Sequence, residues 1–163
     1  MKRANSAIFF WGGIFGVVTS IVWIGHDILV NLANLDVPSS NLLNNALTIT
    51  LILVFGATGV LAARTTGDFE TGAYAGLFAS FIGMIVGGIA LFTITLLFMD
   101  TIRQSMIMVE AFKSSDSSDI TQFIIEDAIG GVIFGGLLSL ALGGLCGAMG
   151  GLIGKMLASR AHA

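Results

Sequence analysis

Hydrophobic residues dominate four long stretches of the chain, and none of these stretches contains Asp, Glu, Lys or Arg. They comprise residues 4–25, 37–63, 71–99 and 128–154. A helix needs roughly 20 apolar residues to cross a bilayer core of about 30 Å, and it must satisfy its own backbone hydrogen bonds there. The pattern therefore predicts an all-α integral membrane protein, a single-domain bundle of four transmembrane helices that span about 7–30, 42–63, 71–99 and 128–154.

The first apolar stretch has a second interpretation. Lys2 and Arg3 precede it, and a basic start followed by an apolar run is also typical of secretory signal peptides. The run continues past Gly25 and lacks a convincing cleavage site between small residues. We therefore expect this helix to be retained.

The first two connections between the stretches are short. We expect residues 36–41 to form a turn, because Pro38 disfavours a helical conformation at Val37. Residues 64–71 form a short polar loop, so the second and third spans should make an antiparallel hairpin. Asp68 and Glu70 lie close to the start of the third span, where the helix dipole favours negative charge.

The third connection, residues 100–127, is polar but has the apolar spacing of a helix. Residues three or four positions apart form one apolar face, namely Ile102, Met106, Val109 and Phe112. A serine-rich break follows at 114–118, after which Asp119 can cap a new helix and Gln122 approximates a capping box. We therefore expect the third helix to continue to about Lys113 and the fourth to begin near Asp119.

Each of these two helices would then have about 40 residues and a length of roughly 60 Å. Both would extend beyond the bilayer and project together as a helical hairpin. The alternative is a helix that lies flat on the lipid surface, although six carboxylates against two basic residues in 100–127 make contact with anionic lipid less favourable. The charged side chains expected to face a partner on this hairpin are Arg103, Glu110, Lys113, Asp116 and Asp119.

Glycine accounts for 22 of the 163 residues, and ten of them lie in the fourth span. Residues four positions apart share a helix face, and glycine there lets another backbone approach closely in lipid. These faces could pack inside the bundle or bind another subunit. The candidate packing or assembly residues are Gly83, Gly87, Gly135, Gly143, Gly147 and Gly151.

Composition and charge agree with a membrane protein. Apolar residues make up 55% of the chain and charged residues 10%, far below the roughly 25% that is usual in soluble domains. The net charge of −3 argues against nucleic-acid binding. Five basic residues fall on the side of the termini and two on the other, so the positive-inside rule places both termini in the cytoplasm of a cell-membrane protein.

Chemistry-bearing residues are scarce. His26 and Asp27 interrupt an apolar stretch, and they lie either at the outer interface or inside the first span, where they could relay protons or bind a cation. We find no catalytic motif, no metal-ligand spacing and no cofactor motif, and the single Cys146 cannot form an internal disulfide. We expect a non-enzymatic membrane protein that acts through protein partners, for example as an accessory subunit of a membrane complex. The alternative is a small channel or transporter that works as a homo-oligomer.

Overall fold

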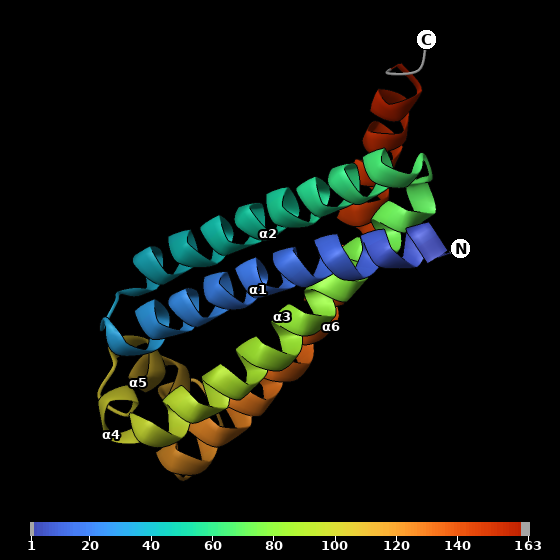
Figure 1. Ribbon diagram of the computed structural model, residues 1–163. Coiled ribbons are helices and arrows are strands. Elements are labelled where there is room, and N and C mark those ends of the chain that lie inside the picture. Colours follow the sequence, from blue (N-terminus) through green and yellow to red (C-terminus); the bar gives the residue numbers. More distant parts are fainter. Residues whose placement is uncertain (1, 161–163) are drawn as a thin grey trace.

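The computed structural model describes residues 2–160, and this part of the chain is helical and contains no strand. Figure 1 shows the helices in an elongated bundle. The helices in chain order are α1 (Lys2–Leu32), α2 (Val37–Thr66), α3 (Phe69–Leu97), α4 (Met99–Ile102), α5 (Met106–Lys113) and α6 (Ile120–Arg160).

Four long helices make the body of the bundle. Helix α3 packs along both α1 and α6, and α2 packs along α6 and, less extensively, along α1 and α3. The start of α1, the α2–α3 turn and the end of α6 lie at one end of the bundle, which we call the terminal end (Figure 1). The α1–α2 connection, α4, α5 and the start of α6 lie at the opposite end, which we call the capped end (Figure 1).

The turn between α1 and α2 is shorter than the sequence predicts. Helix α2 already begins at Val37, so the predictions that the turn extends to Asn41 and that Pro38 keeps Val37 out of a helix are wrong. Proline is tolerated in the first helical turn, where its missing N–H has no intrahelical partner in any case. The Asp36 side chain caps the helix by accepting a hydrogen bond from the Ser39 backbone N–H at 3.0 Å.

The turn between α2 and α3 is tight, as predicted. Gly67 ends α2 with a φ of 75°, a left-handed conformation that glycine adopts without strain. Asp68 then caps α3 by accepting from the Glu70 backbone N–H at 3.2 Å. The negative charge at this position therefore has a structural role at the helix start.

The expected continuation of the third helix to Lys113 is wrong, because α3 ends at Leu97. Phe98 leaves the helical conformation, with φ −115° and ψ 24°, and α4 is a single turn. Ser105 then starts α5 as an N-cap residue whose side chain accepts from the Met108 backbone N–H at 3.3 Å. A serine with this capping role begins a new helix rather than continuing an old one.

The segment from α4 to α5 folds back against the capped end instead of extending the third helix. A cluster of buried side chains joins it to α3 and α6, namely Ile94, Ile102, Met108 and Ile124. Asn34, in the connection between α1 and α2, accepts a hydrogen bond from the Met106 backbone N–H at 3.1 Å. The predicted apolar face is thus only partly correct, because Ile102 is buried whereas Met106 is exposed and Met108 takes its place.

The predicted start of the fourth helix is confirmed. Asp119 precedes α6 and accepts hydrogen bonds from the backbone N–H groups of Thr121 and Gln122, at 2.7 and 3.4 Å. The side chain of Gln122 does not complete the capping box, since it donates to Glu126 instead. Helix α6 has 41 residues, close to the predicted length. Phe112 of α5 and Phe123 in the first turn of α6 pack with their ring centroids 5.7 Å apart, and this contact joins the two helices.

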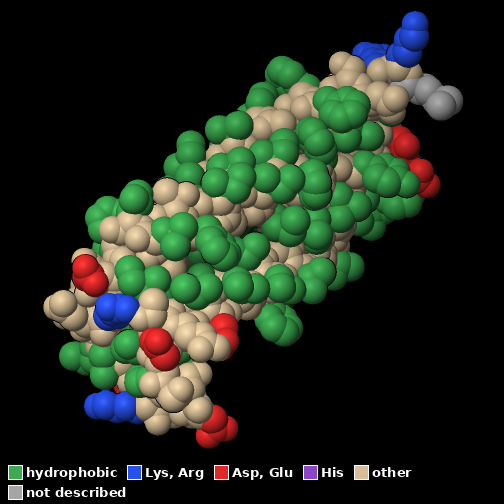
Figure 2. All heavy atoms as spheres, turned by 90° about the horizontal axis from the view of Figure 1, so that it is seen from below, with side chains coloured by type: hydrophobic (Ala, Val, Ile, Leu, Met, Phe, Trp, Pro, Cys, Tyr) green, Lys and Arg blue, Asp and Glu red, His purple; other side chains and the backbone are tan. Residues whose placement is uncertain are grey.

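The four long helices are each apolar and long enough to cross a membrane. Large hydrophobic side chains cover the outside of the bundle body, and charged side chains gather at its two ends (Figure 2). The inside has a different composition, since most buried residues of α3 and α6 are Gly, Ala, Ser or Thr. Small residues thus lie where helices meet, and large apolar residues lie on the exterior.

Candidate functional site

The candidate site lies toward the capped end of the bundle, and α1 supplies the first of its residues. Trp23, Asp27 and Asn31 are spaced four residues apart in α1, so they lie along one face of the helix. Asp27 is buried, with 5% of its surface exposed. The Asp27 side chain therefore lies against the other helices and not on the exterior of the bundle.

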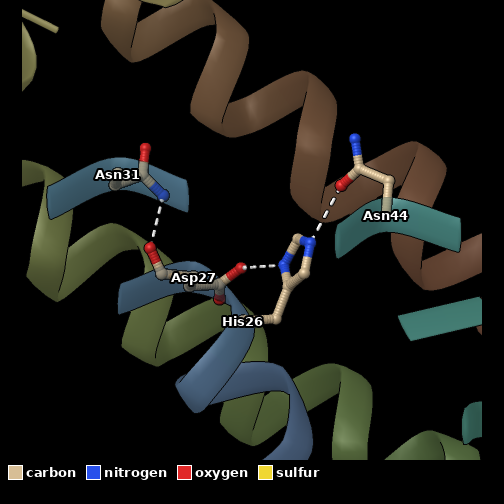
Figure 3. Close-up of polar contacts among 4 residues, drawn as sticks. All are labelled: His26, Asp27, Asn31 and Asn44. Atoms are coloured by element: carbon tan, nitrogen blue, oxygen red, sulfur yellow. Dashed lines mark hydrogen bonds and ion pairs between the residues drawn. The ribbon is translucent and has the colours of Figure 1, made fainter. Parts of the chain in front are cut away.

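His26 and Asp27 form a small polar network with two asparagines (Figure 3). His26 Nδ1 lies 3.4 Å from Asp27 Oδ1, and His26 Nε2 lies 2.8 Å from Asn44 Oδ1 on α2. Asn31 donates to the Asp27 backbone carbonyl at 2.9 Å and does not contact the carboxylate. The network thus links α1 to α2.

His26 is the one side chain that the structure pairs with the Asp27 carboxylate among the described residues. A neutral imidazole has one N–H, so His26 can donate either to Asp27 through Nδ1 or to Asn44 through Nε2, whereas a protonated imidazole can donate to both. No Lys or Arg forms an ion pair with Asp27 in residues 2–160. A buried carboxylate of this kind is costly unless it is protonated or meets a cation.

A cavity of about 340 Å³ lies beside this network. All four long helices and α5 contribute to its wall, which carries a second carboxylate, Asp127 of α6. The polar wall residues include Asn31, Asn44 and Thr95, and none of the lining residues is Lys or Arg. Leu91, Met108, Ile124 and Ala128 make the apolar part of the wall. We call this space the polar cavity.

A second space of about 190 Å³ adjoins the polar cavity and shares Trp23, His26 and Asn44 with it. Two polar atoms in this region are buried without a hydrogen-bond partner in the described chain, the Trp23 indole nitrogen and the Ser139 hydroxyl oxygen. Ser139 is only 1% exposed. Buried polar groups are normally paired, so these two atoms are exceptions within the described chain.

The glycines predicted as packing or assembly residues all meet other helices of the same chain. A Cβ added at Gly147 would lie 2.8 Å from the Gly72 carbonyl oxygen of α3, and a Cβ at Gly143 or Gly151 would lie still closer to α3. Gly83 and Gly87 lie against Thr19 and Trp23 of α1. Gly135 faces the Trp23 ring, 3.3 Å from Cη2.

The charged residues predicted to face a partner lie in the segment between α3 and α6. Four of them are exposed: Glu110, Lys113, Asp116 and Asp119. Arg103 is half-buried and donates to the Thr121 hydroxyl while it lies 3.7 Å from Asp100. Hydrogen bonds from the backbone N–H groups of Thr121 and Gln122 hold the pKa of Asp119 below its usual value of 3.8.

Sequence reasoning singled out His26 and Asp27 but missed the residues that complete the site. Trp23 and Asn31 carried a usable signal, because they flank Asp27 at four-residue spacing. Asn44, Ser139 and Asp127 carried none, since their contact with α1 depends on how the helices are arranged.

The donor set does not suggest a metal site. Within residues 2–160, no three His, Cys, Asp or Glu side chains lie close enough together to hold a metal ion. Comparison of the whole chain with protein-family models, curated proteins and solved structures finds no match. The site must therefore be interpreted from its own geometry.

Proposed function

We propose that this is a non-enzymatic integral protein of the cell membrane, in which α1, α2, α3 and α6 span the bilayer. The distribution of side chains supports this. Large apolar residues cover the exterior of the bundle body and charges lie at its ends. The interior uses small residues, as helix contacts in lipid do. A soluble bundle would have the opposite arrangement.

We further propose that the terminal end is cytoplasmic. Five basic residues belong to this end, namely Lys2, Arg3, Arg64, Lys155 and Arg160, whereas Arg103 and Lys113 belong to the capped end. Basic residues in short connections favour the cytoplasmic side. The polar cavity would then lie toward the outer side of the membrane.

The function best supported by the geometry is that of a small solute-binding transporter or channel. The observation that carries this proposal is the buried Asp27 carboxylate, which lines a polar cavity and forms no ion pair with Lys or Arg in residues 2–160. Ionisable groups in such positions usually mark substrate or ion pathways. A purely structural bundle has no need for this costly group.

A role as an accessory subunit of a membrane complex is the second candidate. It is supported by the exposed charges of α5 and the loop after it, including Glu110, Lys113 and Asp116. The glycine faces support it less, because they contact helices of the same chain. The surface left for another subunit consists mainly of large aliphatic and aromatic side chains.

Reconstitution into liposomes tests the leading proposal. The purified protein should produce charge displacement or solute flux when a panel of small cations is added outside, and Asp27→Asn should abolish it. Asp116→Asn, which changes an exposed carboxylate outside the cavity, is the matched control. Flux that is absent in wild type, or unchanged in Asp27→Asn, would contradict the proposal, and co-purification of a stoichiometric partner would favour the second candidate.

A further inference from the structure

We infer that the ion taken up at this site is the proton, and that His26 and Asp27 bind it together as one pair. This inference rests on the proposed function and names the chemical class of its solute. It follows from the contacts that His26 makes with two helices, from the net charge of the buried pair and from the position of the polar cavity. The bound proton would also link α1 to α2 near the capped end.

His26 lies between an acceptor on its own helix and an acceptor on α2. Its Nδ1 is 3.4 Å from Asp27 Oδ1, and its Nε2 is 2.8 Å from Asn44 Oδ1 (Figure 3). A neutral imidazole has one N–H and can satisfy one of these oxygens, whereas an imidazolium has two and can satisfy both. One added proton therefore completes a continuous hydrogen-bonded link between the two helices.

The net charge of the pair also favours uptake of a proton. When the imidazole is neutral and the carboxylate is ionised, the pair carries one negative charge, and one added proton makes the pair neutral overall. The side chains of His26 and Asp27 are only 13% and 7% exposed, and burial of an uncompensated charge is costly. A proton neutralises the pair in place and needs no additional space between its two members.

The polar cavity brings one further ionisable group toward the pair. Helices α2, α3 and α5 contribute no titratable side chain to the cavity wall, since their lining residues are Asn44, Leu91, Thr95 and Met108. Helix α6 contributes Asp127, which is exposed. The cavity of about 340 Å³ has room for several water molecules. Water and Asp127 would thus exchange protons between the capped end and the pair.

The imidazole of His26 provides the measurement. The chain has two histidines, His26 and His162, so His162→Ala leaves a protein in which isotope-labelled histidine reports on His26 alone. The nitrogen chemical shifts of an imidazole distinguish its two neutral tautomers from the imidazolium. The probe is the proton itself, titrated by NMR in purified, detergent-solubilised protein over roughly pH 5 to 8, where histidine ordinarily changes its charge.

We expect reversible binding of one proton, with a hydrogen on both ring nitrogens of His26 at the acidic end. Asp27→Asn should weaken proton binding by about tenfold or more, because the imidazolium loses a hydrogen bond to a charged group. Asn44→Ala should weaken it by roughly two- to tenfold, because a neutral acceptor is lost. Asp116→Asn, which changes an exposed carboxylate outside the cavity, is the control and should leave the titration unchanged.

His26 signals that stay constant over this pH range would overturn the inference, and so would an unchanged titration in Asp27→Asn. Unchanged or tighter proton binding in Asn44→Ala would overturn the proton-dependent link between α1 and α2, because it would mean that the Asn44 amide nitrogen donates to His26. Asn44 is exposed, so this variant keeps the test available if Asp27→Asn does not fold.

The failure of this inference can be distinguished from the failure of the proposed function. The expected titration without flux of protons or other solutes in liposomes would contradict the transport function and leave the proton site intact. Flux of another cation, together with His26 signals that do not titrate, would overturn the proton site and leave the transport function intact.

Discussion

Helix α6 runs through two regions that use glycine in opposite ways. From residue 143 to 154, its glycines pack closely against α2 and α3. We call this contact the glycine seam, and it is formed by Gly143, Gly147, Gly150, Gly151 and Gly154. Nearer the capped end, Gly131 lines the polar cavity and Gly135 faces the Trp23 ring, while a Cβ at Gly130 would meet nothing within 4 Å.

The difference teaches that spacing alone does not define what a glycine does. In the seam, the opposing residues are themselves small, such as Gly72 and Gly76 of α3, so the backbones come into contact. Near the capped end, the residues opposite Gly131 and Gly135 are the larger Leu91 and Trp23. Both of these side chains also line the polar cavity.

The largest effect should come from a bulky residue in the seam. A Cβ at Gly147 would lie 2.8 Å from the Gly72 carbonyl oxygen and 3.1 Å from the Gly76 Cα, and a backbone cannot turn aside as a side chain can. Gly147→Leu should therefore destabilise the bundle at or above the upper end of the usual overpacking cost of about 1–3 kcal/mol. Thermal unfolding in detergent, followed by circular dichroism, measures the loss.

Gly25→Leu is the matched control for this substitution, since no atom lies within 4 Å of a Cβ at that position. It should unfold close to the wild-type temperature. Equal unfolding temperatures for Gly147→Leu and wild type would mean that the seam is not a tight contact.

A smaller substitution should separate the two regions by the sign of its effect. At Gly150, a Cβ would fall on the Gly56 carbonyl, so Gly150→Ala should lower the free energy of unfolding by about 1–3 kcal/mol. Gly130→Ala meets open space and should raise it by about 0.5–1 kcal/mol, because alanine restricts the unfolded chain. Changes of the same sign in both variants would refute the comparison.

The serines of the two regions should also respond differently. Ser80 lies against Gly143 in the seam and donates to the Leu77 carbonyl at 2.9 Å, so Ser80→Ala should cost about 0.5–1.5 kcal/mol. Ser139 has no partner in the described chain, so Ser139→Ala should leave the stability unchanged or raise it by up to about 1 kcal/mol. Unfolding curves of the ligand-free variants give both values, and a loss in Ser139→Ala would show that its hydroxyl is satisfied.

The smallest effect should be local and depend on pH. The pKa of Asp119 is lower in the folded protein than its usual value of 3.8, chiefly because of hydrogen bonds from the Thr121 and Gln122 backbones. The stabilisation by this cap is therefore complete above the unfolded pKa and is lost as the pH falls through the folded pKa. Hydrogen exchange at Thr121 and Gln122, corrected for the intrinsic pH dependence, should lose protection in that acidic range.

Asp119→Ala should remove this pH dependence and lower the protection of the first turn of α6 at neutral pH. Asp116→Ala, in the same loop, should change neither. A pH response that persists in Asp119→Ala would assign it to another group.

The sequence predicted the parts of the fold that depend on local pattern. Four long apolar stretches became the four long helices, and Asp119 correctly marked the start of α6. The prediction failed where a short-range signal competed with periodicity. Ser105 ended the helical pattern of residues 102–112 by capping a separate helix, and Pro38 began a helix rather than preventing one.

The candidate site was less predictable, because it is assembled from distant residues. His26 and Asp27 stood out as polar residues in an apolar stretch. The sequence also shows that Trp23 and Asn31 lie four residues before and after Asp27. Asp127 and Ser139 reach the cavity region only because α6 packs between α2 and α3. No pattern along one helix reports such an arrangement, which depends on how four faces fit together.

The position of α6 has a consequence for how the protein is made. The last helix in the chain packs along both α2 and α3, so neither glycine face can be covered until α6 has left the ribosome. Synthesis of the 63 residues from the end of α3 at Leu97 to Arg160 takes about 3–13 s at 5–20 residues per second. In the proposed membrane, the first three helices would remain without α6 for that time. During this interval, their uncovered glycine faces would be accessible to insertion factors, to proteases and to helices of other proteins.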